Sequence, residues 1–154
     1  MRIKQFRLEL DHDRMPVMVM EAVHECEYPV TSPDKVAQLC NEAFGLNRRA
    51  EEHVLLLAMG SDGPIALFEV AHGQVNGCRV GAVEVLKRLL LCGTATGGIL
   101  IHNHPSGHLP ESVEDTMLCN RMLEAFQIVG LNLYDFMIVA GDSYKSFRDD
   151  GKLE

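Results

Sequence analysis

Two histidines and one aspartate are spaced so that they could hold a single metal ion. His102 and His104 follow an apolar run, and Asp115 comes eleven residues after the second histidine. Alternate residues of a strand point to the same side, so both imidazoles can reach one point. Two imidazoles and a carboxylate suit zinc, and three protein ligands leave the fourth tetrahedral position for water. Because bound zinc lowers the pKa of that water towards about 7, the pattern predicts a metal site that can activate water.

The elements around these residues favour the same interpretation. A pair of glycines precedes the apolar segment Ile99–Ile101, which is expected to form a short buried strand ending at His102. Ser112 is suited to cap a helix that runs to about Val129. Asp115 is then the third helical residue, where the helix dipole favours a carboxylate anion. The histidines therefore lie at the carboxyl end of a strand, where open α/β sheets place their sites.

The remaining pattern predicts an α/β domain with one central mixed sheet flanked by helices. Residues 1–31 are expected to form a strand extension packed on a domain made by residues 32–151. Apolar or alternating runs bounded by turn residues indicate strands, and helical spacing with a Ser-Pro-Asp start indicates helices. The further strands are expected at 2–10, 16–23, 54–59, 64–71, 131–140 and 144–147, and the further helices at 33–44 and 80–91.

Composition and charge limit the class of protein. The 154 residues, of which 47% are hydrophobic and 23% charged, suit one globular domain. The net charge of −8 and the scattered basic residues disfavour nucleic-acid binding, because that affinity rests on Lys and Arg neutralising phosphates. No apolar run approaches the ~20 residues that span a bilayer, so we expect no membrane segment.

The cysteines and the start of the chain predict a cytoplasmic location. The five cysteines are an odd number without a Cys-x-x-Cys pair, which does not suit a disulfide framework. The polar start has no signal-peptide core. We expect the cysteines to be small core residues in a reducing compartment. Zinc deaminases need a Cys-x-x-Cys pair, so that class is disfavoured. The cysteines are Cys26, Cys40, Cys78, Cys92 and Cys119.

The spacing around the expected ligands resembles a known motif. His-x-His, seven residues, Ser, two residues and Asp match the JAMM metalloprotease motif. The sequence HNHPSG followed by S-x-E-D is similar to the RadC-like JAB branch of the MPN superfamily. The likeness covers residues 32–151 and includes the strand near residues 52–56 and the two closing strands.

This resemblance implies a cytidine-deaminase-like α/β fold and a catalytic zinc ion. By motif position, the ligands would be His102, His104 and Asp115. Ser112 would help to stabilise the oxyanion of a tetrahedral intermediate. No other cofactor is implied.

The family also implies a glutamate upstream of the motif that acts as general acid and base. Glu52 is our first choice, because it leads the expected strand and aligns with the acidic residue of the family there. Glu51 is the next candidate, and Glu69 and Glu84 are more distant ones. A base at position 52 could take the proton of the attacking water and deliver it to a leaving amine.

The function expected from this resemblance is zinc-dependent hydrolysis of a peptide or isopeptide bond in a peptide or protein substrate. Two alternatives are a non-catalytic MPN-type interaction scaffold and a module associated with DNA repair. RadC-type members often carry a helix-hairpin-helix module, whereas residues 1–31 indicate strands instead. These strands could form an interface in a homo-oligomer.

Overall fold

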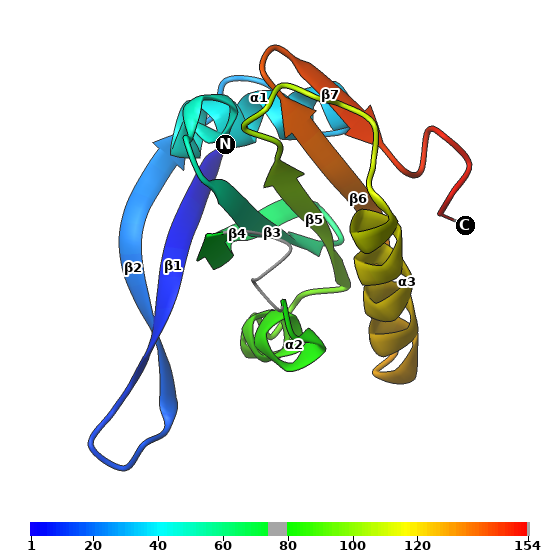
Figure 1. Ribbon diagram of the computed structural model, residues 1–154. Helices are drawn as coiled ribbons and strands as arrows, with labels where there is room; N and C mark the ends of the chain where they lie inside the picture. Colours follow the sequence, from blue (N-terminus) through cyan, green and yellow to red (C-terminus); the bar gives the residue numbers. More distant parts are fainter. Residues whose placement is uncertain (74–79, 154) are drawn as a thin grey trace.

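The computed structural model describes residues 1–73 and 80–153 of the chain (Figure 1). Within these residues, seven strands alternate with three α-helices and one short 3₁₀ helix at Leu46–Arg48. The strands are β1 (Arg2–Leu10), β2 (Pro16–Glu25), β3 (Glu52–Gly60), β4 (Gly63–Gly73), β5 (Gly97–Asn103), β6 (Asn132–Ala140) and β7 (Ser143–Ser146). The helices are α1 (Pro33–Phe44), α2 (Ala82–Leu91) and α3 (Val113–Ile128).

All seven strands belong to one sheet, whose order is β2-β1-β4-β3-β5-β6-β7. Strand β5 is an inner strand, with β3 antiparallel on one side and β6 parallel on the other. Strand β1 runs parallel to β4 through the three pairs that begin with Lys4 and Ala66. The sheet is therefore mixed, and the predicted α/β fold with a central mixed sheet flanked by helices is confirmed.

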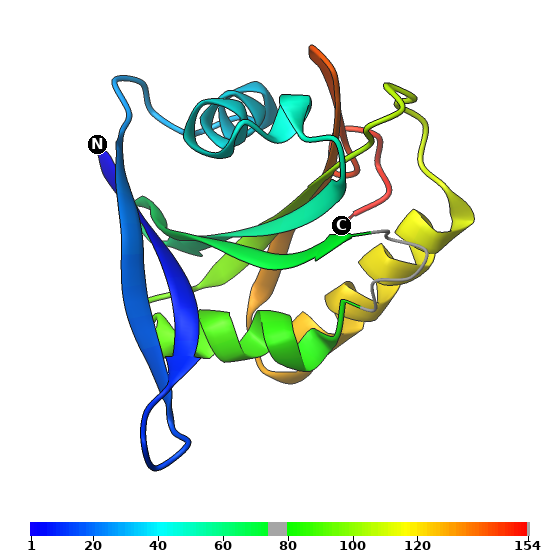
Figure 2. The same cartoon turned by 60° about the vertical axis from the view of Figure 1, so that its left-hand side comes forward.

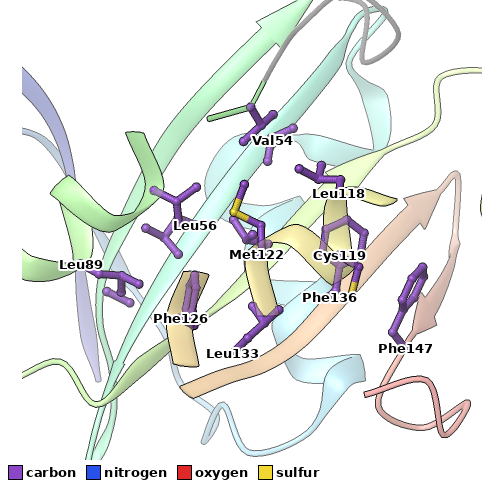
Figure 3. Packing of buried hydrophobic residues seen from close by; sticks show 14 of the residues in the cluster. Val54, Leu56, Leu89, Leu118, Cys119, Met122, Phe126, Leu133, Phe136 and Phe147 are labelled. Atoms are coloured by element: carbon purple, nitrogen blue, oxygen red, sulfur yellow. The ribbon is translucent and has the colours of Figure 1, made fainter. Parts of the chain in front are cut away.

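The helices cover both faces of the sheet, which gives three layers. Helix α1 lies on one face, and α2 and α3 lie on the other (Figure 2). Figure 3 shows how Leu118, Met122 and Phe126 of α3 pack against Val54 and Leu56 of β3. These five side chains are 5% exposed or less, so the packing of α3 on the sheet excludes water. The burial of apolar surface, about 25 cal/mol per Å², is what holds the helix against the strands.

The observed elements follow the predicted ones closely, with two differences near the candidate site. Strand β5 extends two residues further at each end than the predicted Ile99–Ile101 and so contains both Gly97 and His102. Strand β3 begins at Glu52 rather than at Val54. Both extensions depend on pairing with neighbouring strands, which a local apolar pattern does not reveal.

Gly97 is required by the close approach of β6. A Cβ atom at this position would lie 2.0 Å from the carbonyl oxygen of Asn132 and 2.8 Å from the ring of Tyr134. The first contact is to backbone, which cannot rotate away. Gly97 is therefore part of β5, whereas the expected strand began after it at Ile99.

We expect Gly97→Ala to lower the free energy of unfolding by at least about 3 kcal/mol, because overpacking against backbone forces the strands apart. Urea denaturation followed by circular dichroism measures the change. Gly93→Ala is the matched control, since a Cβ there meets nothing within 4 Å, and it should stay within about 0.5 kcal/mol of wild type. Equal denaturation midpoints for the two variants would contradict this account of the β5–β6 contact.

The N-terminal hairpin continues the sheet, because β1 pairs with both β2 and β4. The division into an extension at 1–31 and a domain at 32–151 stays a prediction.

Among the predicted core cysteines, Cys26, Cys40 and Cys119 are buried, and Cys92 is partly buried. Cys78 lies outside the described residues. None of the described helices is long and apolar enough to cross a membrane.

Candidate metal centre

The three predicted ligands come together at one point. Nε2 of His102 lies 2.9 Å from one carboxylate oxygen of Asp115, and Nε2 of His104 lies 3.2 Å from the other. The two Nε2 atoms are 3.3 Å apart. Ligand atoms of a tetrahedral zinc ion, with bonds of about 2.0–2.1 Å, are separated by roughly 3.3 Å. The donor set and its spacing therefore fit a zinc ion.

His102 is positioned by the centre of the sheet. It pairs with Val54 of β3 on one side and Ile138 of β6 on the other, and it is 1% exposed. Its ring packs against that of Phe136 in a T-shaped arrangement, with 5.4 Å between the ring centres. Because both neighbouring strands and an aromatic ring surround it, the imidazole has little freedom, which favours a preorganised site.

His104 is oriented by a hydrogen bond on the far side of its ring. Its backbone N–H donates to Val139, which holds the residue just beyond the end of β5. Its Nδ1 lies 2.7 Å from the carbonyl oxygen of His108. A carbonyl can only accept, so Nδ1 carries a proton, and Nε2 is the nitrogen that faces Asp115 and whose lone pair could bind an ion. Such a second contact commonly fixes the tautomer of a metal-ligating histidine.

Asp115 is fixed by the start of α3. Ser112 is the N-cap, and its Oγ accepts a hydrogen bond from the Asp115 N–H at 3.1 Å. The Asp115 carboxylate accepts in return from the Ser112 N–H at 2.8 Å. This reciprocal pair is a capping box, and it directs the carboxylate towards the end of β5. The predicted cap and the predicted third helical position are both confirmed.

The electrostatics of the centre favour an ionised aspartate. Burial raises the pKa of the Asp115 carboxyl, but hydrogen bonds from His102, His104 and Ser112 outweigh it and hold the pKa well below its ordinary value. The hydrogen bond to Asp115 raises the pKa of His104. Without a metal ion the carboxylate thus interacts with imidazole protons, and a cation is the natural replacement for them.

A cavity of about 320 Å³ opens beside these ligands and contains both predicted catalytic residues. Glu52 stands on the face of β3 that also carries Val54, because alternate residues share a face. The Ser112 hydroxyl accepts from the helix N-terminus, which leaves its O–H hydrogen able to donate into the cavity. The lining residues are Glu52, His104, Ser106, His108, Pro110, Glu111, Ser112 and Asp115.

The other candidate glutamates lie elsewhere. Glu51 is 62% exposed and pairs with His72 at 2.7 Å. Glu69 pairs with His53 at 2.8 Å, on the face of the sheet opposite to the ligands. Glu84 of α2 interacts with the two basic residues one turn further along its own helix. The structure thus brings Glu52 alone of the four to the cavity among the described residues.

The residues that anchor the loop between the histidines and Ser112 were not predicted from the sequence. Glu111 pairs with Lys145 at 2.9 Å and also with Lys152. Lys145 makes a further ion pair with Asp150. The two ion pairs of Glu111 tie the loop to the C-terminal segment, and no local spacing signals them because both lysines lie more than thirty residues further along the chain.

Two features define the class of this protein. The fold is a mixed α/β sheet, and the candidate site combines His-x-His at the end of an inner strand with an aspartate in the first turn of the next helix. A model of the RadC-like JAB domain matches residues 30–152. The chain belongs to that family. The resemblance drawn from HNHPSG and its downstream serine and aspartate is thereby confirmed, together with the JAB-type fold.

The similar curated proteins carry the name UPF0758. One from Neisseria gonorrhoeae is 32% identical over 135 residues, which cover 88% of this chain and 59% of that protein. UPF0758 protein GSU0386 from Geobacter sulfurreducens is 32% identical over 83% of this chain and 55% of its own length. One from Thermotoga maritima is 41% identical over 66 residues, or 43% of this chain and 30% of its own. The chain spans somewhat more than half the length of the first two relatives.

Proposed function

We propose that this protein is a zinc-dependent hydrolase of the JAMM type that cleaves a peptide or isopeptide bond. The observation that carries the proposal is the convergence of two imidazole nitrogens and a carboxylate at separations of 2.9–3.3 Å. All three belong to the chain segment that resembles the JAMM motif. They adjoin a cavity that has room for a short stretch of substrate backbone.

His102, His104 and Asp115 would hold the ion. Bound there, zinc would polarise the carbonyl of the substrate and make water a stronger nucleophile. The carboxylate of Glu52 would accept a proton from the attacking water and later deliver it to the leaving amine. Both steps need a carboxylate close to the reacting atoms, and Glu52 lines the same cavity as two of the ligands.

Ser112 would have two tasks in this proposal. Its oxygen caps α3 and so fixes the backbone that presents Asp115. Its O–H hydrogen, not needed by the cap, would donate to the oxyanion that forms when the carbonyl is attacked. A rigid cap is a good location for such a donor, because it need not be ordered again at the moment of reaction.

The competing function is a non-catalytic interaction scaffold that uses the same surface. Two imidazoles and a carboxylate converge beside a cavity that Glu52 and Ser112 line, and this set supports catalysis, since a scaffold has no need of it. A DNA-repair module is less well supported, because the net charge is −8.

We also propose a peptide or protein substrate and a cytoplasmic location, the latter from the free cysteines. A homo-oligomer formed through the N-terminal strands remains part of the proposal.

Metal analysis and a cleavage screen together test this function. We expect about one zinc ion per purified chain by inductively coupled plasma mass spectrometry. We expect a peptide library to be cleaved, the cleavage to stop with a chelator and to return with added zinc. Cleavage that a chelator leaves unchanged would rule out the metal mechanism. Stoichiometric zinc without cleavage of peptides or isopeptides would favour the scaffold.

A further inference from the structure

Asn103, the residue between the two histidines, makes an unusual set of hydrogen bonds. It is 2% exposed, and its side chain points to the face of β5 opposite to the ligands. Its Oδ1 accepts from the backbone N–H of His53 at 2.7 Å. Its Nδ2 donates to the carbonyl oxygen of Glu51 at 3.0 Å and is 3.4 Å from that of Arg49. One side-chain amide thus pairs with backbone groups on both sides of Glu52.

These hydrogen bonds extend the pairing of β3 with β5 beyond the last pair of residues that the two backbones form. Backbone pairing between the two strands ends where Val54 meets His102. Towards the start of β3, Glu52 and His53 lie beyond this pairing. On the side of β3 that faces β5, the hydrogen-bonding partner of this stretch is the side-chain amide of Asn103. An amide has one acceptor and two donors in a plane, so it can replace a peptide group in a ladder.

We propose that Asn103 is a positioning residue that holds Glu52 over the metal centre. This inference rests on the proposed function, in which Glu52 transfers the proton. Neighbouring residues of β5 then have complementary tasks. The histidine on one face binds the ion, and the asparagine on the other fixes the strand that carries the base. The relative place of ion and carboxylate is set by one short segment, HNH.

The requirement for asparagine is chemical. Asp at this position would keep an acceptor for the His53 N–H but would lose the donor to Glu51. Ser is too short to reach both groups, and Leu has neither donor nor acceptor. Because the site is buried, a backbone group that loses its hydrogen bond to the amide cannot bond to water instead. Residues 51–53 would then shift to find other partners and would carry the Glu52 carboxylate with them.

The first experiment uses metal-free protein, so that it does not depend on the proposed function. We compare wild type, Asn103→Ala and Asn103→Asp by nuclear magnetic resonance, with the Glu52 carboxyl ¹³C signal assigned from Glu52→Gln. We expect the Glu52 signal to move or broaden in both Asn103 variants. We expect the His53 amide to exchange at least about tenfold faster in Asn103→Ala. An unchanged Glu52 signal in Asn103→Ala overturns the proposal, whether or not the protein binds metal.

A matched control separates positioning from a general loss of stability. Asn41 also accepts a backbone N–H, that of Asn47 at 3.1 Å, but it lies at the α1 side away from the ligands. Asn41→Ala should therefore leave the Glu52 signal at its wild-type position. If Asn41→Ala moves that signal as far as Asn103→Ala does, the effect is a general loosening and the proposal is wrong.

The second experiment uses the cobalt-substituted protein, whose visible absorption reports the surroundings of the ion. The absorption is followed as the pH is changed, and the midpoint of its change is measured. We expect Glu52→Gln to shift this midpoint by about one pH unit, which is a tenfold change in proton affinity. Asn103→Ala should shift it in the same direction with the same cobalt content. The double variant should shift it no further than Glu52→Gln, because both changes act through one carboxylate. Additive shifts, or a wild-type midpoint in Asn103→Ala, would contradict positioning. Failure of wild type to bind cobalt would instead refute the proposed function.

Discussion

Asp115→Asn is expected to remove stoichiometric zinc from the protein while leaving the fold intact. The asparagine oxygen can still accept from the Ser112 N–H, so the capping box that begins α3 is largely kept. The side chain can no longer supply an anion to the ion. Changes outside the ligand shell alone weaken metal binding by about 10–100-fold, so loss of this charge should cost at least about a hundredfold.

The comparison with Asp115→Ala isolates the structural part of that effect. Alanine leaves Nε2 of His102, in a side chain 1% exposed, without its partner at 2.9 Å. It also leaves the Ser112 N–H uncapped. We expect metal-free Asp115→Ala to lose about 2–4 kcal/mol of unfolding free energy, from one buried polar group and one cap. Metal-free Asp115→Asn should lose less than half as much.

The pH dependence of this difference has a defined sign. The pKa of Asp115 is lowered by folding, so its contribution to stability is present above about pH 4 and is lost as the pH falls through the folded value. The pKa of His104 is raised, so its contribution is present below about pH 6.5 and is lost as the pH rises through the folded value. The gap between metal-free wild type and Asp115→Ala should therefore be widest between these limits.

Zinc content is measured after dialysis, and zinc affinity by titration against a chromophoric chelator. The free energy of unfolding is measured by urea unfolding of the metal-free proteins. Wild-type zinc content and affinity in Asp115→Asn would show that the carboxylate is not a ligand. A large loss of stability in both variants would show that they report folding and not metal binding.

The parts of the centre that are local in sequence could be predicted before the structure. Ser112 is a residue type suited to the N-cap, and Asp115, three residues later, is then the third residue of the helix. His102 and His104 are two apart after an apolar strand, and the alternation of a strand places both on one side. Each pair needs only the geometry of a single element, so residue type and spacing were sufficient.

The parts that depend on pairing between distant strands could not be predicted in the same way. The place of Gly97 inside β5 follows from the approach of β6, thirty-five residues later. The hydrogen bond that the His53 N–H donates to Asn103 Oδ1 spans 50 residues. The choice of Glu52 over Glu51 came from the family likeness and not from spacing. Its support now comes from the register that places Val54 opposite His102, because this sets the face on which Glu52 stands.

Glu52→Gln is expected to lower turnover of a cleaved peptide by roughly 10²–10⁴-fold, the usual contribution of general acid and base catalysis. Glutamine has nearly the same size and keeps hydrogen-bonding groups, so the cavity should keep its shape. It cannot accept a proton at neutral pH. Since Glu52 is not among the ligand atoms that converge within 4.8 Å, zinc content should stay equal to wild type.

The matched comparison is Glu51→Gln, which tests the other candidate base at the adjacent position. The Glu51 side chain is 62% exposed and bound to His72, so its loss should change turnover less than about threefold. A strong loss in Glu51→Gln with little effect of Glu52→Gln would exchange the two assignments. Loss of zinc in Glu52→Gln would make that carboxylate a ligand instead of a base. A fall in turnover that spares zinc and substrate affinity is the result that the general-base role requires, because the proton is transferred only in the chemical step.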